Sequence, residues 1–246
     1  MWTDMRLALG IVREAARVAE REFAGRRFRV WRKADGSEVT SADLAVEDLV
    51  RRLLAEAVPE DGVAGEERPE RAGTSGRRWL VDPISGTAGF VAGRPEYSVD
   101  LALEGALAVS ALPSLGVTMA AGRGIGCRIF RGGREEIARV STRDEVNGAR
   151  VCLHGKKKPL LPQCVVVGSR VPVLRLISGE VDAVMAAGAG LDEFDLACLP
   201  VLVEEAGGRV TVVEEDVVLA TNGALHDVLL PLLVARPGVE PGTPGS

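Results

Sequence analysis

Several residue types and patterns are scarce in this chain of 246 residues, and each scarcity excludes a class of protein. Only two histidines are present, His154 and His226, so a metal site built on imidazole ligands is not expected. No apolar run is long enough to span a bilayer, and the amphipathic pattern of the first residues leads us to expect no signal peptide. The net charge is −5, whereas a nucleic-acid-binding surface is expected to carry an excess of basic residues. We therefore expect neither a membrane nor a nucleic acid as a partner.

Cysteines are also few and widely separated. They form no C-x-x-C pair, and each has apolar residues beside it; they are Cys127, Cys152, Cys164 and Cys198. Free, buried thiols are the expected state in such a sequence, rather than disulfides or a zinc site. This usage indicates a reducing compartment, and we expect a cytoplasmic protein.

Apolar residues are plentiful, and their spacing predicts the secondary structure. They make up 46% of the chain, enough for one large domain or two packed halves. Helical spacing predicts helices over residues 5–23 and 41–57, with a strand and a loop or hairpin over 30–37. From residue 78 to about 140, period-two alternation and glycine-marked turns predict strands.

The polar, irregular segment 141–163 is the expected seam between two halves. Strands predicted over 164–167, 181–186 and 209–213 then alternate with helices predicted over 172–179, 195–206 and 224–234. These patterns predict an α/β protein, with an α+β N-terminal half over 1–140 and an α/β C-terminal half over 141–235. The tail over 236–246 is rich in proline and glycine, and we expect it to be disordered.

Residues 79–90, Trp-Leu-Val-Asp-Pro-Ile-Ser-Gly-Thr-Ala-Gly-Phe, are the most informative stretch. They predict a buried strand, an Asp-Pro turn and a small-residue turn that opens a short helix. Asp82 would then be fixed at a strand end beside free backbone N–H groups, which suits a metal ion that holds a phosphate. Glu66 and Asp195 are further acids at element ends. Any one of them alone would more often be a helix cap or a surface charge.

Together these motifs resemble the inositol monophosphatase superfamily of magnesium-dependent phosphomonoesterases. The family's motifs occur here in the family order, as Thr40-Ser41-Ala42-Asp43, Gly65-Glu66-Glu67, Asp82-Pro83-Ile84-Ser85-Gly86-Thr87, and Phe194-Asp195 with Glu205-Ala206-Gly207-Gly208. The resemblance covers roughly residues 5–235. It implies a layered α-β-α-β-α sandwich, a homodimer, and hydrolysis of a small hydroxylated phosphate monoester such as a sugar, cyclitol, histidinol or nucleotide 3′-phosphate.

The resemblance also implies a set of metal ligands for two or three magnesium ions. Glu66, Asp82 and the backbone carbonyl of Ile84 would hold the first ion. Asp82 would bridge to a second ion, which it would share with Asp195 and with the residue at position 85. The chemistry is consistent with these roles, because two metal ions that share a carboxylate can neutralise a phosphate and stabilise the leaving oxygen.

The remaining roles implied by the resemblance concern water, phosphate and substrate. Asp43 and the hydroxyl of Thr87, together with the first metal ligand Glu66, would orient and activate the attacking water. Position 85 and the N–H groups of Gly86 and Thr87 would bind the phosphate oxygens. Asp192 or Glu193 would reach the substrate hydroxyls, although a solvated loop charge is the alternative for each.

Ser85 departs from the family pattern, which has an acid at this position. A neutral hydroxyl is a poor ligand for a hard cation, so the second metal site is in question. Two interpretations follow: an active phosphatase in which water completes the coordination, and an impaired member that binds a phosphorylated ligand or partner without efficient hydrolysis. An aspartate replaced by serine in the laboratory would leave the same sequence.

Overall fold

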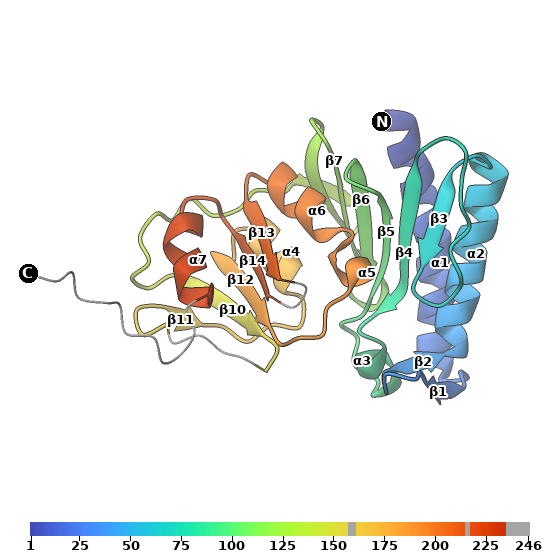
Figure 1. Cartoon of the computed structure of the whole chain (residues 1–246), viewed down its shortest axis with the longest axis horizontal. Helices are drawn as coiled ribbons and strands as arrows, with labels where there is room; N and C mark the ends of the chain where they lie inside the picture. The colour runs from blue at the N-terminus through green and yellow to red at the C-terminus, as the bar shows by residue number, and fades with distance from the viewer. Residues whose placement is uncertain (157–160, 215–216, 235–246) are drawn as a thin grey trace, which may run out of the picture. The chain divides into compact units, whose positions relative to one another are not determined.

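The computed structural model describes residues 1–156, 161–214 and 217–234 (Figure 1). The tail over 236–246, for which we predict disorder, lies outside the described residues. The chain divides into two compact units, one formed by Met1–Arg139 with Leu191–Gly208, and the other by Val140–Gly190 with Arg209–Ser246. The segment Leu191–Gly208, which the sequence analysis assigns to the second half, therefore belongs to the first unit.

Two long helices cover one face of the first unit's large sheet (Figure 1). They are α1 (Trp2–Gly25) and α2 (Ser41–Ala57), which agree with the predicted helices over 5–23 and 41–57. Between them, β1 (Val30–Arg32) and β2 (Glu38–Thr40) pair antiparallel, which confirms the predicted hairpin. α1 buries a stripe of apolar residues against the sheet: Met5, Ala8, Ile11, Val12, Ala15 and Ala19.

The large sheet has seven strands in the order β3-β4-β5-β6-β7-β8-β9. Only β3 and β4 are parallel; the other neighbours are antiparallel, as short turns between successive strands require. The strands are β3 (Gly62–Gly65), β4 (Arg78–Ser85), β5 (Ser98–Leu103), β6 (Leu107–Leu112), β7 (Val117–Gly122), β8 (Gly126–Arg131) and β9 (Arg134–Ile137). A five-residue helix, α3 (Thr87–Val91), follows β4.

The opposite face of this sheet carries two short helices from the segment Leu191–Gly208 (Figure 1). They are α5 (Glu193–Leu196) and α6 (Leu199–Glu205), where the sequence predicts one helix over 195–206. Pro200 lies in the first turn of α6, where its missing N–H costs no hydrogen bond, and this favours a new helix start. The Glu205 carboxylate accepts the N–H groups of Gly124 and Gly126 at 3.1 and 3.0 Å, which fixes the segment to the β7–β8 turn.

The second unit is a five-stranded mixed sheet in the order β11-β10-β12-β14-β13. Its strands are β10 (Arg150–His154), β11 (Val165–Val166), β12 (Ala183–Ala187), β13 (Arg209–Glu214) and β14 (Val217–Thr221), with helices α4 (Pro172–Ile177) and α7 (His226–Val234). β10 lies inside the segment predicted to be irregular, and β14 is not predicted at all. Both are short, five-residue strands, and such lengths carry little periodic signal.

The buried carboxylate of Asp182 organises the loop that leads into β10. It accepts the backbone N–H of Arg150 at 2.7 Å and the hydroxyl of Ser141 at 2.5 Å. Asn222 adds a second tie, because its side-chain amide donates to the Ser141 hydroxyl and to the carbonyl of Arg143. The polar composition that makes this segment look like a seam therefore serves internal hydrogen bonds.

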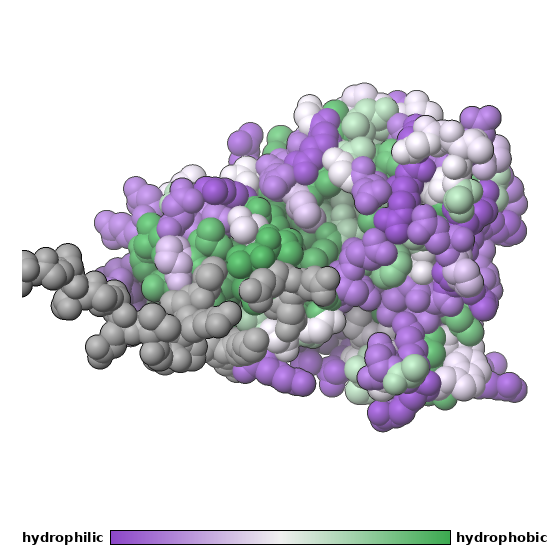
Figure 2. Space-filling view, in the orientation of Figure 1, coloured by the Kyte–Doolittle hydropathy of each residue, from purple (hydrophilic) through white to green (hydrophobic). Residues whose placement is uncertain are grey.

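Figure 2 shows hydrophilic residues over much of the visible face of the first unit. All four cysteines are free, as predicted, and Cys164 alone is only half-buried. Among the helices in the described ranges, none is both long and apolar enough to cross a membrane.

We predict that the second unit loses stability in acid through His226. Its buried ring contacts the hydroxyls of Thr211 and Thr221 at 2.8 and 3.0 Å, and burial, with help from nearby Arg209, lowers its pKa below the usual 6.5. The unfolded chain then binds more protons than the folded one, so this contribution is present above pH 6.5 and is lost as the pH falls through the lowered pKa. Melting temperatures between pH 7.5 and 5 should fall less steeply for His226→Gln than for the wild type.

His154→Gln is the matched control, since it removes the other imidazole of the chain from an exposed position. A flattening of the pH dependence in His154→Gln equal to that in His226→Gln would contradict the assignment to His226.

Candidate active site

Asp43 is held at the start of α2 by a reciprocal hydrogen-bond pair. The Thr40 hydroxyl caps the helix by accepting the N–H groups of Ala42 and Asp43, and one carboxylate oxygen of Asp43 accepts the Thr40 N–H at 2.8 Å. This capping box is what the Thr-x-x-Asp motif builds. The other carboxylate oxygen of Asp43 stays available, and it lies 3.1 Å from the hydroxyl of Thr87.

The hydroxyl of Thr87 links α2 to the end of β4. It lies 2.9 Å from the backbone carbonyl of Ile84 as well as 3.1 Å from Asp43. Phe90, on the same short helix, anchors this position by packing against Phe28 and Tyr97, with ring centroids 4.9 and 4.8 Å away. Three predicted site residues are therefore brought together by the structure.

The turn Gly65-Glu66-Glu67 follows β3 and is shaped by a buried carboxylate that the motif does not include. Glu47 of α2 accepts the backbone N–H of Glu67 at 2.7 Å, and Arg51 holds Glu47 at the same distance. Gly65 makes this approach possible, because a Cβ at that position would lie 2.2 Å from the Glu47 carboxylate. No motif of the sequence marks Glu47, although its position four residues after Asp43 places it on the same helix face.

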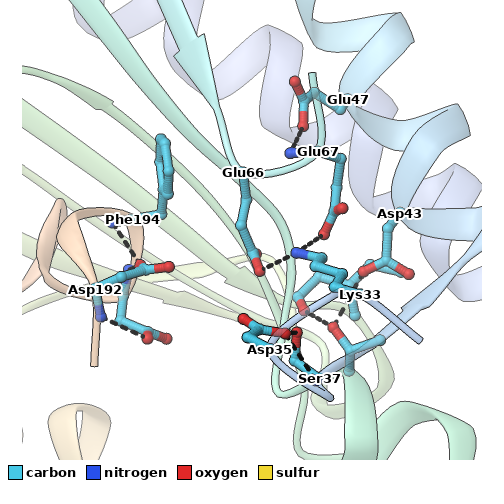
Figure 3. A network of polar contacts seen from close by, with 12 residues as sticks. Lys33, Asp35, Ser37, Asp43, Glu47, Glu66, Glu67, Asp192 and Phe194 are labelled. Atoms are coloured by element: carbon cyan, nitrogen blue, oxygen red, sulfur yellow. Dashed lines mark hydrogen bonds and ion pairs between the residues drawn. The ribbon is translucent and has the colours of Figure 1, made fainter. Parts of the chain in front are cut away.

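Lys33 provides a cation beside this turn (Figure 3). Its ammonium group lies 2.6 Å from Glu66 and 2.7 Å from Glu67. Burial lowers the pKa of Lys33, but the hydrogen bonds to Glu66 and Glu67 outweigh it, so its pKa lies above the usual range. Glu66 therefore carries a charged lysine on its carboxylate, and its own charge acts on Asp82. No motif of the sequence marks this lysine.

A one-residue bulge changes the direction of the chain at the end of β4. Asp82 is opposite Asp100 on β5, whereas Ser85 is opposite Ser98, so β4 has one residue more than its partner in this interval. Pro83 lies in the bulge, where a missing N–H does not break the ladder. Gly86 then adopts φ +85°, which favours glycine, and α3 begins at Thr87.

Asp82 and Asp100 form a buried pair of carboxylates on neighbouring strands. Opposite residues of an antiparallel pair project from the same face of the sheet, and their Cβ atoms are about 4.5–5.5 Å apart. One oxygen of each carboxylate is buried with no hydrogen-bond partner. Burial raises the pKa of Asp82, and Asp100 is the largest charge that raises it further. Burial also raises the pKa of Asp100, to about 6. In the sequence, Asp100 is only one position of an alternating strand.

Asp195 adds its negative charge to those of Asp82 and Asp100. The acids just before it, Asp192 and Glu193, have partners of their own. The repulsion of Asp195 raises the pKa values of both Asp82 and Asp100. Asp192 caps α5 by accepting the N–H groups of Phe194 and Asp195 at 2.8 and 3.1 Å (Figure 3). Glu193 pairs with Arg78 at 3.1 Å. Substrate binding by Asp192 and Glu193 remains a prediction.

The donor set at this strand end suits a hard divalent cation. All the candidate ligands are oxygens, and the unpartnered oxygens of Asp82 and Asp100 are the kind of buried atom that such an ion satisfies. Within the described ranges, however, no three Asp, Glu, His or Cys side chains stand together as a ready-made metal site. The residues fit a metal ion in their chemistry, and the side chains must adjust to enclose it.

We predict that Gly65→Ala destabilises the protein by about 1–3 kcal/mol, because the new methyl group forces the buried Glu47 carboxylate away from Glu67 and Arg51. Gly10→Ala is the matched control: it lies in the exposed middle of α1 with no atom within 4 Å of the added Cβ, and it should stabilise by roughly 0.5–1 kcal/mol. Equal unfolding free energies for the two variants in urea would show that Glu47 does not constrain this turn.

Comparison with known proteins places the chain in a family. Residues 3–236 match the model of the inositol monophosphatase family. A histidinol-phosphatase of Mycobacterium tuberculosis is 33% identical, with 94% of this chain and 98% of that protein covered.

Solved structures show the same fold. The extragenic suppressor protein suhB of Bartonella henselae matches with a TM-score of 0.81 at 23% identity, over 96% of this chain and all of that one. An IMPase/NADP phosphatase complexed with Mg2+ and phosphate matches with a TM-score of 0.77 at 20% identity, over 95% of each chain. These matches confirm the predicted α/β fold. The chain belongs to the inositol monophosphatase family, a family of phosphatases, as its motifs predict.

Proposed function

We propose that this protein is a magnesium-dependent phosphomonoesterase that hydrolyses a small hydroxylated phosphate monoester with an activated water. The observation that carries the proposal is the contact of the Thr87 hydroxyl with Asp43 and with the carbonyl of Ile84, two residues after Asp82. A buried acid, a hydroxyl and a strand-end carboxylate are the parts needed to position a water beside a metal-held phosphate. The similar histidinol-phosphatase supports the substrate class, and the structure solved with Mg2+ and phosphate supports the metal.

Four groups of this chain would hold magnesium: the carboxylates of Glu66, Asp82 and Asp195 and the carbonyl of Ile84. When bound, magnesium supplies charge neutralisation for the phosphate and makes bound water a better nucleophile. Lys33 contacts Oε1 of Glu66, so Glu66 would join this set through its other carboxylate oxygen or after the lysine moves away.

Asp43 and Thr87 would move the proton of the attacking water. Thr87 has a single hydroxyl proton, which it can donate to Asp43, and its oxygen then accepts a hydrogen bond from the water. Burial raises the pKa of Asp43, which makes its carboxylate a better proton acceptor than an exposed aspartate. We assign phosphate binding to Ser85 and to the N–H groups of Gly86 and Thr87, which begin α3 after the left-handed glycine.

The substrate, the oligomeric state and the cellular compartment are also proposed. Histidinol phosphate, sugar phosphates, cyclitol phosphates and nucleotide 3′-phosphates all remain candidate substrates, and Asp192 and Glu193 are the acids proposed to contact their hydroxyls or amines. We also propose a homodimer, as expected from the resemblance. The four free thiols agree with a cytoplasmic setting.

A second candidate function is binding without efficient hydrolysis. Ser85 favours it, because a hydroxyl replaces the family's acid at this position. Phosphate release from a panel of histidinol, inositol, sugar and nucleotide 3′-phosphates, with Mg2+ and with chelator, separates the two. Release that depends on Mg2+ supports the phosphatase. Saturable binding of a panel member with no release, by a folded protein loaded with Mg2+, would contradict the phosphatase and support the second function.

We predict that Thr87→Val lowers kcat by about 100-fold or more, because the variant cannot pass the proton of water to Asp43. Its loss of hydrogen bonds should cost only about 1–2 kcal/mol of stability, so the variant should remain folded. Thr87→Ser keeps the hydroxyl and is the matched control, with kcat expected within about tenfold of the wild type. Similar kcat values for the valine and serine variants would exclude the hydroxyl from the reaction.

A further inference from the structure

We propose that Asp100 is a metal ligand of this protein and replaces the acid that the family motif has at position 85. This inference rests on the proposed function, since it concerns the same magnesium site. It assigns a role to a residue outside the motifs, and it explains how Ser85 is tolerated.

Register places Asp100 where such a ligand is needed. Asp100 is directly opposite Asp82, and Ser98, two residues earlier on the same strand, is opposite Ser85. Residues two apart on a strand share a face, and the Ser98 hydroxyl donates to one oxygen of Asp100 at 3.2 Å. Position 85 therefore lacks an acid, but the next cross-strand pair contains one. It is Asp100, whose side chain lies on the same face of the sheet as that of Asp82.

The burial of Asp82 and Asp100 favours a cation between them. Asp82 is 2% exposed and Asp100 is 9% exposed, and each has a carboxylate oxygen without a hydrogen-bond partner. Among the described residues, neither acid forms an ion pair with a lysine or arginine. Two buried like charges without a counterion are strongly unfavourable, and a divalent cation shared between them removes both the repulsion and the unsatisfied oxygens.

The hydrogen-bond partners of Asp100 leave one of its carboxylate oxygens available to bind a metal ion. On the neighbouring strand β6, Ser110 is opposite Asp100, and the hydroxyls of Ser98 and Ser110 both stabilise the charged form of its carboxylate. Asp195 adds a third negative charge that acts on Asp82 and Asp100. Serines at these two positions orient the carboxylate without neutralising it, as the partners of a metal-ligating carboxylate do.

The test is a titration with Mn2+ alone, in which electron paramagnetic resonance measures the free and the bound ion. It compares four proteins: wild type, Asp100→Asn, Ser85→Asp and the double variant. We expect the wild type to bind two Mn2+ ions per chain, and Asp100→Asn to bind one of them at least about 10-fold more weakly. In the double variant the aspartate at position 85 should restore that affinity. Asp48→Asn, which removes an exposed acid from α2, is the control and should bind both ions as the wild type does.

Melting temperatures without metal separate ligation from a structural role. Asp100→Asn should melt no lower than the wild type, because it removes a repulsion, whereas its stabilisation by Mn2+ should shrink. A lower melting temperature with unchanged Mn2+ affinity would overturn the proposal and make Asp100 a structural residue.

The remaining outcomes also decide the question. Binding of a single ion by the wild type, or additive effects of the two substitutions on affinity, would overturn the role of Asp100 while leaving the proposed phosphatase in place. Absence of any Mn2+ binding by the folded wild type would overturn both this inference and the metal dependence of the proposed function.

Discussion

The repulsion between two buried carboxylates is the constraint on which the candidate site depends. Asp82 and Asp100 face each other across β4 and β5 in the interior of the first unit, each with an unsatisfied oxygen. Such an arrangement costs stability unless a cation or a proton neutralises it, and it persists only because a large sheet and its helices hold the two strands in place. Stability and function are in conflict at this point, and metal binding is the event that would relieve the conflict.

The rest of the site consists of groups that other elements hold near the end of β4. The capping box at Thr40 fixes Asp43 on α2, and the bulge at Pro83 together with the left-handed Gly86 turns the chain so that Thr87 reaches Asp43. None of these contacts is strong by itself, but each fixes a different element against the end of β4. Lys33 places one positive charge between Glu66 and Glu67 and offsets part of their negative charge, whereas Asp82 and Asp100 form no ion pair among the described residues.

Much of this site could be predicted from sequence, because its motifs are local. The segments Thr40–Asp43, Gly65–Glu67 and Asp82–Thr87 each combine a chemical group with the turn or cap that positions it, and such combinations are visible in one stretch of sequence. Glu47, Lys33 and Asp100 were missed because their importance comes from pairing with distant residues. Asp100 has the alternation of an ordinary strand, and only the register of β4 against β5 shows that it faces Asp82. Likewise, the sequence does not predict β10, because only its pairing with β11 and β12 shows that these five residues form a strand.

The metal-binding role of Asp100 is tested most directly by a crystal structure of the wild-type chain grown with Mn2+, with anomalous scattering data collected to locate the metal. If Asp100 is a metal ligand, we expect an anomalous peak within bonding distance of both Asp82 and Asp100. A manganese ion bound by Glu66 and Asp82 with Asp100 turned away from it, or no peak at this end of β4, would contradict this role of Asp100.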